Sequence, residues 1–245
     1  MEKAIETGKI FTKVGPMKDD LWQYLKQVAG ELWGVSGVSR RVRVGLWMLM
    51  GAMWWHSRQT AWHSLRVGRG TAVLGAKLGR DVEEVGWLFA VGLAHDVGKL
   101  AVPVGVLDKP GKLSEEEFEV IKRHVTSKAW PVFLVRIQSW RYPKRWKRVY
   151  EALAWHHMNW DGSGYGPDGE VREGMEIPEV ARMIHAADWL DALRNRNDRK
   201  ADGRKMMEVE REILRGVGSL FDPEIGQVAR DWVRMFGENA GVSGR

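Results

Sequence analysis

Hydrophobic residues recur along this chain at intervals of three and four positions, which is the period of an α-helix packed on one side. The pattern predicts helices over residues 17–33, 40–55, 63–79, 81–97, 114–129, 145–158, 179–196, 202–217 and 222–236. The sequence has neither a sustained strand-type alternation nor an internal repeat. We therefore expect an all-α fold.

Tryptophans mark one face of the early part of the chain. Trp47, Trp54, Trp55 and Trp62 lie seven or eight positions apart, which predicts that they stack along one face of a continuous helix. Packing in a core or a dimer explains such a stripe better than a ligand-binding aromatic box.

The chain is expected to divide into an N-terminal helical extension, residues 1–50, and a main domain, residues 51–245. The extension is too short for a sensory domain of ordinary size. Its apolar residues at helical spacing favour a dimerisation element, so a homodimer is expected. This apolar set comprises Leu21, Trp22, Leu25, Val28, Leu32 and Trp33.

Composition restricts the chemistry more than the fold. The 245 residues are 44% hydrophobic and 29% charged, as in ordinary globular proteins, and none is a cysteine. Disulfide scaffolds, thiolate zinc sites and thiol catalysis are therefore excluded, and any metal must be held by nitrogen and oxygen ligands. The net charge of +6 attracts phosphate-bearing partners without specifying which ones.

Membrane insertion and secretion are not expected. The longest apolar run, residues 44–55, is too short to span a bilayer. The acidic start, Met1-Glu2, is not followed by the basic and apolar regions of a signal peptide. A cytoplasmic location is the expectation.

Three groups of polar residues interrupt the apolar helices. The His95-Asp96 pair lies in an otherwise apolar stretch, where an ionised carboxylate without a partner costs several kcal/mol, and a metal ion supplies that partner. His156 and His157 are adjacent at a probable helix end, where both side chains can reach one region. Asp188 falls within another apolar helix. Nitrogen and carboxylate ligands on separate helices indicate a metal site inside a bundle.

Six segments with chemically informative residues follow one another between about residues 55 and 230. They are His63-Ser64-Leu65-Arg66-Val67, His95-Asp96-Val97-Gly98-Lys99, residues 107–113, residues 121–124, His156-His157 through Gly166, and residues 187–193. In their order and spacing these segments resemble the HD superfamily of metal-dependent phosphohydrolases, and within it the HD-GYP subgroup.

The resemblance implies an HD-domain helical bundle that holds two divalent metal ions, iron or manganese, with zinc also suited to the ligands. It implies hydrolysis of the cyclic dinucleotide cyclic di-GMP to the linear dinucleotide, to GMP, or to both. One ion would be held by His63, His95, Asp96 and Asp188, and the other by Asp96, His124, His156 and His157.

Asp96 is thus the expected bridge, since two carboxylate oxygens can hold two ions about 4 Å apart. In this hypothesis a metal-bridging hydroxide attacks phosphorus, while Lys99 stabilises charge on the phosphoryl oxygens. The alternative for Lys99 is a helix-end cation that satisfies carbonyl groups. The expected substrate contacts are Lys99, Tyr165, Arg196 and Lys200.

Among the departures from the family pattern, three affect the expected metal count, partner or substrate. Gln59 replaces a glutamate found in members that hold a third metal, which predicts two ions. The Gly-Tyr-Pro triplet reads Gly164-Tyr165-Gly166, a loop that is also a candidate contact for a protein partner. Residues 197–200 read Asn-Asp-Arg-Lys where the family has arginine-proline-tyrosine followed by a basic residue.

Two alternatives therefore stay open. One is an HD phosphohydrolase of another nucleotide or cyclic dinucleotide. The other is a catalytically silent metal-binding signalling module.

Overall fold

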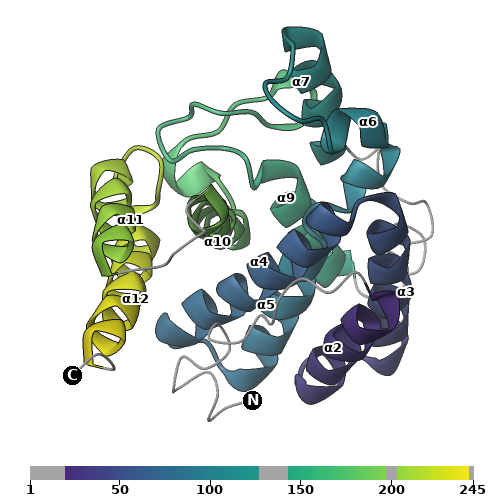
Figure 1. The fold of residues 1–245 in the computed structure, drawn as a ribbon, viewed down its shortest axis with the longest axis horizontal. Helices are drawn as coiled ribbons and strands as arrows, with labels where there is room; N and C mark the ends of the chain where they lie inside the picture. The colour runs from purple at the N-terminus through teal and green to yellow at the C-terminus, as the bar shows by residue number, and fades with distance from the viewer. Residues whose placement is uncertain (1–19, 127–142, 197–202, 243–245) are drawn as a thin grey trace.

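A computed structural model describes residues 20–126, 143–196 and 203–242 of the chain (Figure 1). The described residues form helices and no strand, with two isolated bridges, Met158 to Gly164 and Val217 to Phe221. The all-α prediction is confirmed. Across these same residues, no helix combines the length and the apolarity needed to cross a bilayer.

The helices vary from one turn to more than five turns in length. Several begin at a side-chain cap: Ser57, Asp81 and Ser114 each accept a hydrogen bond from a first-turn backbone N–H. Their bounds are α2 (Leu21–Gly34), α3 (Arg40–His56), α4 (Arg58–Lys77), α5 (Val82–Ala94), α6 (Val104–Leu107), α7 (Glu115–Lys122), α9 (Pro143–Trp155), α10 (Glu179–Arg196), α11 (Gly203–Gly216) and α12 (Pro223–Val242). Two short 3₁₀ helices are relevant to the site, η2 (Val97–Ala101) and η3 (Arg123–Val125).

Helices α4 and α5 pack side by side at the centre of the molecule, and α10 packs against α4 (Figure 1). Glycines allow the close approach of the central pair. A Cβ atom on Gly68 would lie 3.0 Å from the carbonyl oxygen of Phe89, and one on Gly92 would lie 2.7 Å from Oγ1 of Thr71. This tight crossing brings the side chain of α4 residue His63 next to that of His95, with ring centroids 5.3 Å apart.

The prediction of one continuous helix through the tryptophans is wrong, because the helix is interrupted at Ser57. Ser57 has extended backbone angles, φ −148° and ψ 113°, and its hydroxyl caps the next helix. The stripe is consequently divided: Trp54 and Trp62 are buried on different helices, whereas Trp55 is 76% exposed.

Two other predicted helices end earlier than their periodicity suggested. The helix expected over 81–97 ends at Ala94, and the one expected over 114–129 ends at Lys122. Each is followed by a short 3₁₀ helix, so His95 and Asp96 lie between α5 and η2, and His124 lies on η3 rather than within an α-helix. Side chains at such ends can face one another across neighbouring elements.

The first described helix, α2, contributes to the same hydrophobic core as α4. Tyr24, Val28 and Leu32 are fully buried, and the Tyr24 hydroxyl donates a 2.9 Å hydrogen bond to the carbonyl of Ala61. Arg69 of α4 pairs with Glu31 of α2. Whether residues 1–50 act as a separate unit stays a prediction.

Candidate metal centre

The centre is built where the ends of several helices meet around Asp96, whose side chain is completely buried. Asp96 precedes the 3₁₀ helix η2, and His124 lies on η3, which packs against η2. His156 and His157 follow the end of α9, while His63 and Asp188 lie on α4 and α10. Asp96 thus lies between elements that are remote in the sequence.

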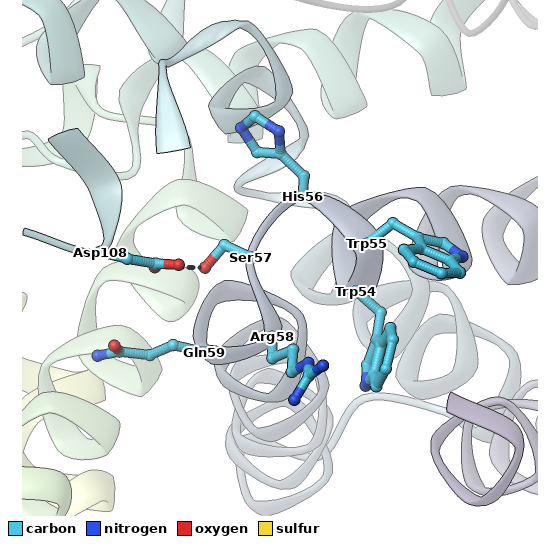
Figure 2. A pocket seen from close by; sticks show the side chains of 7 residues that line it. All are labelled: Trp54, Trp55, His56, Ser57, Arg58, Gln59 and Asp108. Atoms are coloured by element: carbon cyan, nitrogen blue, oxygen red, sulfur yellow. Dashed lines mark hydrogen bonds between the residues drawn. The ribbon is translucent and has the colours of Figure 1, made fainter. Parts of the chain in front are cut away.

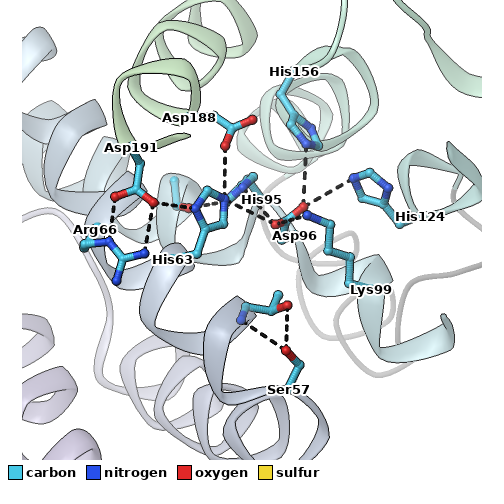
Figure 3. A network of polar contacts seen from close by, with 12 residues as sticks. Ser57, His63, Arg66, His95, Asp96, Lys99, His124, His156, Asp188 and Asp191 are labelled. Carbon is cyan, nitrogen blue, oxygen red and sulfur yellow. Dashed lines mark hydrogen bonds and ion pairs between the residues drawn. The ribbon is translucent and has the colours of Figure 1, made fainter. Parts of the chain in front are cut away.

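The structure arranges these side chains in two groups that share Asp96, and Figure 3 labels the members of both groups except His157. One group contains His63, His95 and Asp96, and the other contains Asp96, His124, His156 and His157. Within each group, one nitrogen or oxygen atom of every residue lies within 4.8 Å of the others. Asp188 adjoins the first group, with its Oδ1 atom 3.0 Å from Nε2 of His63. All seven predicted ligands are therefore brought together, and their role as ligands remains a proposal.

Hydrogen bonds from the outer ring nitrogens orient the histidines. Nδ1 of His95, His124 and His156 donates to the backbone carbonyl three residues earlier, at 2.8, 2.6 and 2.9 Å respectively. A carbonyl oxygen can only accept, so Nδ1 carries a proton and Nε2 is the ring nitrogen that faces the centre. Metal-binding histidines commonly have this arrangement, because the outer hydrogen bond selects the tautomer.

Several inward-facing atoms have no hydrogen-bond partner among the described residues. These buried atoms are Nε2 of His95, His156 and His157 and Oδ1 of Asp96. Unpartnered buried polar atoms are rare because each costs free energy. A cluster of nitrogen lone pairs beside a carboxylate is a donor set that suits iron, manganese or zinc, so the residues present fit the implied metals.

The ionisation of the centre also suits cations. Burial raises the pKa of Asp96, but His95 and Lys99 outweigh burial and hold that pKa well below its usual value. Burial likewise opposes ionisation of Asp188, and its hydrogen bond with His63 reverses the effect. Burial and neighbouring histidines lower the pKa values of His156 and His157. Both carboxylates are thus ionised and both of these imidazoles neutral, as metal binding requires.

The predicted substrate contacts are only partly described. Nζ of Lys99 donates a 2.6 Å hydrogen bond to Oδ2 of Asp96, so this lysine contacts the carboxylate rather than helix-end carbonyls. The Tyr165 ring stacks on that of His157, with centroids 4.7 Å apart. Arg196 is the last residue of α10, and Lys200 lies outside the described residues together with the rest of 197–202.

Two residues of the site were not singled out from the sequence. Asp191 accepts a 2.7 Å hydrogen bond from Nδ1 of His63, and Arg66 binds the same carboxylate through Nε and Nη2 at 2.6 and 3.0 Å. A signal was present, because Asp191 and Arg66 each follow a predicted ligand by three positions, on the same helix face.

The two histidines outside the predicted ligand set have local roles. His56 ends α3 and is separated from His63 by the turn at Ser57, and Nε2 of His56 bonds to the carbonyl of Val102 at 2.7 Å. Nδ1 of His185 donates to the carbonyl of His156 at 3.0 Å. His185 therefore holds the backbone of a predicted ligand.

A cavity of about 390 Å³ opens at the junction of α3 and α4 (Figure 2). Gln59, which lines it, precedes His63 by one turn on the same face of α4. The hydroxyl of Ser57 donates a 2.8 Å hydrogen bond to Asp108 across this cavity, and Arg58 lies over the Trp54 ring. The lining residues are Trp54, Trp55, His56, Ser57, Arg58, Gln59 and Asp108.

Comparison with known proteins gives several relatives of substantial identity. A 3′3′-cGAMP-specific phosphodiesterase of Vibrio cholerae serotype O1 is 38% identical over 137 residues, which are 56% of this chain and 29% of that protein. A cyclic di-GMP phosphodiesterase of Thermotoga maritima is 35% identical over 172 residues, 67% of this chain and 44% of that protein. A cyclic di-GMP phosphodiesterase response regulator of Xanthomonas campestris pv. campestris is 36% identical over 160 residues, which are 65% of this chain and 40% of that protein. This chain spans less than half the length of each of these relatives.

The family comparison agrees with the ordered motifs. The model of the HD domain matches residues 56–225 of the 245-residue chain, which include all seven predicted metal ligands. The chain belongs to the HD domain family.

Proposed function

We propose that this chain is a two-metal phosphodiesterase that hydrolyses cyclic di-GMP to the linear dinucleotide, to GMP, or to both. The observation that carries the proposal is the pair of histidine and carboxylate groups sharing the buried Asp96. The similarity to cyclic dinucleotide phosphodiesterases supports the substrate class.

In this proposal one cation is held by the His63 group with Asp188, and the other by the His124 group, with Asp96 common to both. Iron or manganese is the proposed metal, and zinc also suits these ligands. When bound, two divalent cations supply Lewis-acid activation of the phosphodiester and of the attacking water. The protein residues hold the substrate and position the ligands.

Lys99 has the clearest role among the remaining charged groups. Its ammonium group is 2.6 Å from Asp96 Oδ2, close enough to contact a phosphoryl oxygen placed beside that carboxylate. A fixed positive charge there stabilises the negative charge that develops on the phosphoryl group. Tyr165, which covers His157, is the proposed neutral contact for the substrate. Arg196 and Lys200 remain proposed phosphate contacts.

The cavity at the α3–α4 junction offers a place for a nucleoside portion of the substrate. Its lining combines indole rings with a guanidinium, an amide and a carboxylate. Aromatic and guanidinium planes stack on nucleobases, and polar groups read their edges. We propose that the nucleoside next to the cleaved phosphodiester enters this cavity.

A second candidate substrate is 3′3′-cGAMP. The observation that favours it is the 38% identity to the Vibrio cholerae enzyme specific for that dinucleotide. The two substrates differ in one base only, so the choice between them depends on base contacts rather than on the metal centre. Further candidates are other nucleotides and a catalytically silent signalling role.

The test is a metal count and a hydrolysis assay on one anaerobic preparation. We expect two metal ions per chain and turnover of cyclic di-GMP faster than of 3′3′-cGAMP and cyclic di-AMP. Asp96→Asn should abolish turnover, because it removes the shared anionic ligand. Asp231→Asn, an exposed carboxylate on α12, is the matched control and should retain full activity.

The outcomes separate the candidates. Faster turnover of 3′3′-cGAMP would favour the second substrate, and two metals without turnover of any cyclic dinucleotide would indicate another phosphoester. A chain that binds metal but hydrolyses no phosphoester would favour the silent metal-binding signalling role, and a chain without metal would contradict the two-metal proposal.

The proposed homodimer and the partner contact through Gly164-Tyr165-Gly166 stay predictions. Measuring the mass of the full chain in solution tests the dimer. The mass of a single chain would contradict it.

A further inference from the structure

His63 differs from the other oriented histidines in what its outer nitrogen contacts. In His95, His124 and His156, Nδ1 donates to a neutral backbone carbonyl of the same local turn. In His63, Nδ1 donates to the carboxylate of Asp191, which is 128 residues away in the sequence and lies on a different helix. The two groups around Asp96 are therefore not oriented in the same way.

Asp191 is itself held firmly. Arg66 binds both oxygens of its carboxylate, at 2.6 and 3.0 Å, and Arg66 follows His63 by one helical turn on α4. The Asp191 side chain is only 6% exposed, so water cannot easily replace these contacts. Bidentate arginine–carboxylate pairs restrict both partners geometrically. Arg66 and Asp191 thus fix the His63 ring between α4 and α10 (Figure 3).

The charge around the two groups is also unequal. The His63 group has two carboxylates near its nitrogen atoms, Asp96 and Asp188. The charge of Asp191 behind the ring is paired with Arg66, and Lys99 lies 2.6 Å from Oδ2 of Asp96. The His124 group has only the shared carboxylate of Asp96, and its other members are imidazoles. Opposite charge within a few ångströms strengthens the binding of a divalent cation, especially in a buried site.

We propose that the two metal positions are inequivalent, that the position containing His63 binds a divalent cation more tightly, and that Asp191, held by Arg66, is the positioning residue responsible. This inference rests on the proposed two-metal function. An anionic acceptor on Nδ1 makes Nε2 a stronger electron donor than a carbonyl does, and it fixes the ring at the same time. At limiting metal the protein should carry one ion, in the His63 position.

The experiment is a titration of the chelator-stripped full chain with Mn²⁺, following free Mn²⁺ by its paramagnetic resonance signal. Wild type should bind two ions in two steps, the first with a dissociation constant at least about tenfold lower. Asp191→Asn retains an acceptor for Nδ1 but loses the negative charge. It should weaken the first step by about 10- to 100-fold, the range found for outer-shell partners of metal ligands. The affinity of the His124 position should change by less than about twofold.

Three further variants keep the result interpretable. His157→Asn should remove the second step and leave the first. Arg66→Lys keeps the charge but not the bidentate geometry, so it should weaken the first step by less than Asp191→Asn does. Asp231→Asn should leave both steps unchanged. Far-ultraviolet circular dichroism and thermal unfolding of each variant identify any loss of fold.

Two equal steps in wild type would overturn the inference and leave the two-metal proposal standing. The same follows if Asp191→Asn weakens both steps equally in a folded protein, or if His157→Asn removes the tight step. Failure of wild type to bind any Mn²⁺ would overturn the inference and the metal proposal together.

Discussion

The main chain of Gly98 packs directly against that of His124: a Cβ atom at Gly98 would lie 1.9 Å from the His124 carbonyl oxygen. This contact joins η2 to η3 and so sets the distance between Asp96 and His124. Oδ1 of Asp96 lies 3.3 Å from Nε2 of His124. A glycine is needed here for space, because the neighbouring atoms are backbone and cannot move aside as a side chain can.

Gly98→Ala should therefore force η2 and η3 apart. We expect a loss of about 1–3 kcal/mol in the free energy of unfolding, as for other overpacked sites, and weaker metal binding by the His124 group. Urea unfolding and a metal count measure the two effects. Gly105→Ala is the matched control, since a Cβ there meets nothing within 4 Å. Equal stability of the two variants would contradict the packing argument.

Lys99→Gln should separate catalysis from metal binding. Removing the ammonium group beside Asp96 eliminates a charge that stabilises the phosphoryl transition state, so kcat should fall by about 100- to 1,000-fold. Metal content should not fall, because the lost group is a cation that opposes metal binding. Steady-state kinetics and a metal count on one sample test this prediction. The control is Lys147→Gln, which removes a 77% exposed lysine on α9 and should change neither kcat nor metal content. If Lys99→Gln loses metal and activity in parallel, the role assigned to Lys99 is refuted.

The stability of the metal-free protein should depend on the ionisation of His63. Burial disfavours the charged ring, but its hydrogen bonds to Asp188 and Asp191 outweigh burial and raise the pKa to about 9, from an ordinary 6.5. When folding raises the pKa of a group, the charged group stabilises the folded state fully at pH values below its pKa in the unfolded state. This stabilisation is lost as the pH rises through the pKa in the folded state. The free energy of unfolding should therefore fall between pH 6.5 and about 9, by at most about 3 kcal/mol.

Urea unfolding in the presence of a chelator, at several pH values, measures this dependence. Asp191→Asn should flatten the curve over the same window, because it removes one of the two partners that raise the pKa. Stability that rises from pH 6.5 to 9 would show that His63 is neutral in the metal-free fold.

Substitution of Tyr24 should show that α2 stabilises the main bundle. Tyr24→Ala should cost about 3–5 kcal/mol, as for other large buried side chains, since Tyr24 packs edge-on against Trp62 at 4.9 Å. Tyr24→Phe should cost about 0.5–1.5 kcal/mol, because the hydrogen bond from the Tyr24 hydroxyl to the carbonyl of Ala61 is lost. Thermal and urea unfolding give both values. Trp22→Ala, on the same helix but 59% exposed, is the control, and a loss as large as that of Tyr24→Ala would contradict this view.

The sequence by itself determined the helical class, the family and the candidate ligands. Helical periodicity is a local property, because the residues on one face lie three or four positions apart. Helix starts are also local, as at Ser114, which forms a capping box with Glu117 three positions later. The seven predicted ligands could be named from the sequence alone, because it shows both the polar residues within apolar segments and the order of the motifs.

Only the tertiary structure decided where the helices break and which distant residues meet. Periodicity continued across Ser57, but the capped turn there redirects the chain, and the tryptophan stripe is divided. The bond from His63 to Asp191 joins residues on α4 and α10, and no local spacing specifies that pairing. Contacts of this kind arise from the packing of whole helices. The difference between the two proposed metal positions therefore depends on the folded bundle. The sequence contains the residues that produce this difference but does not show that they meet.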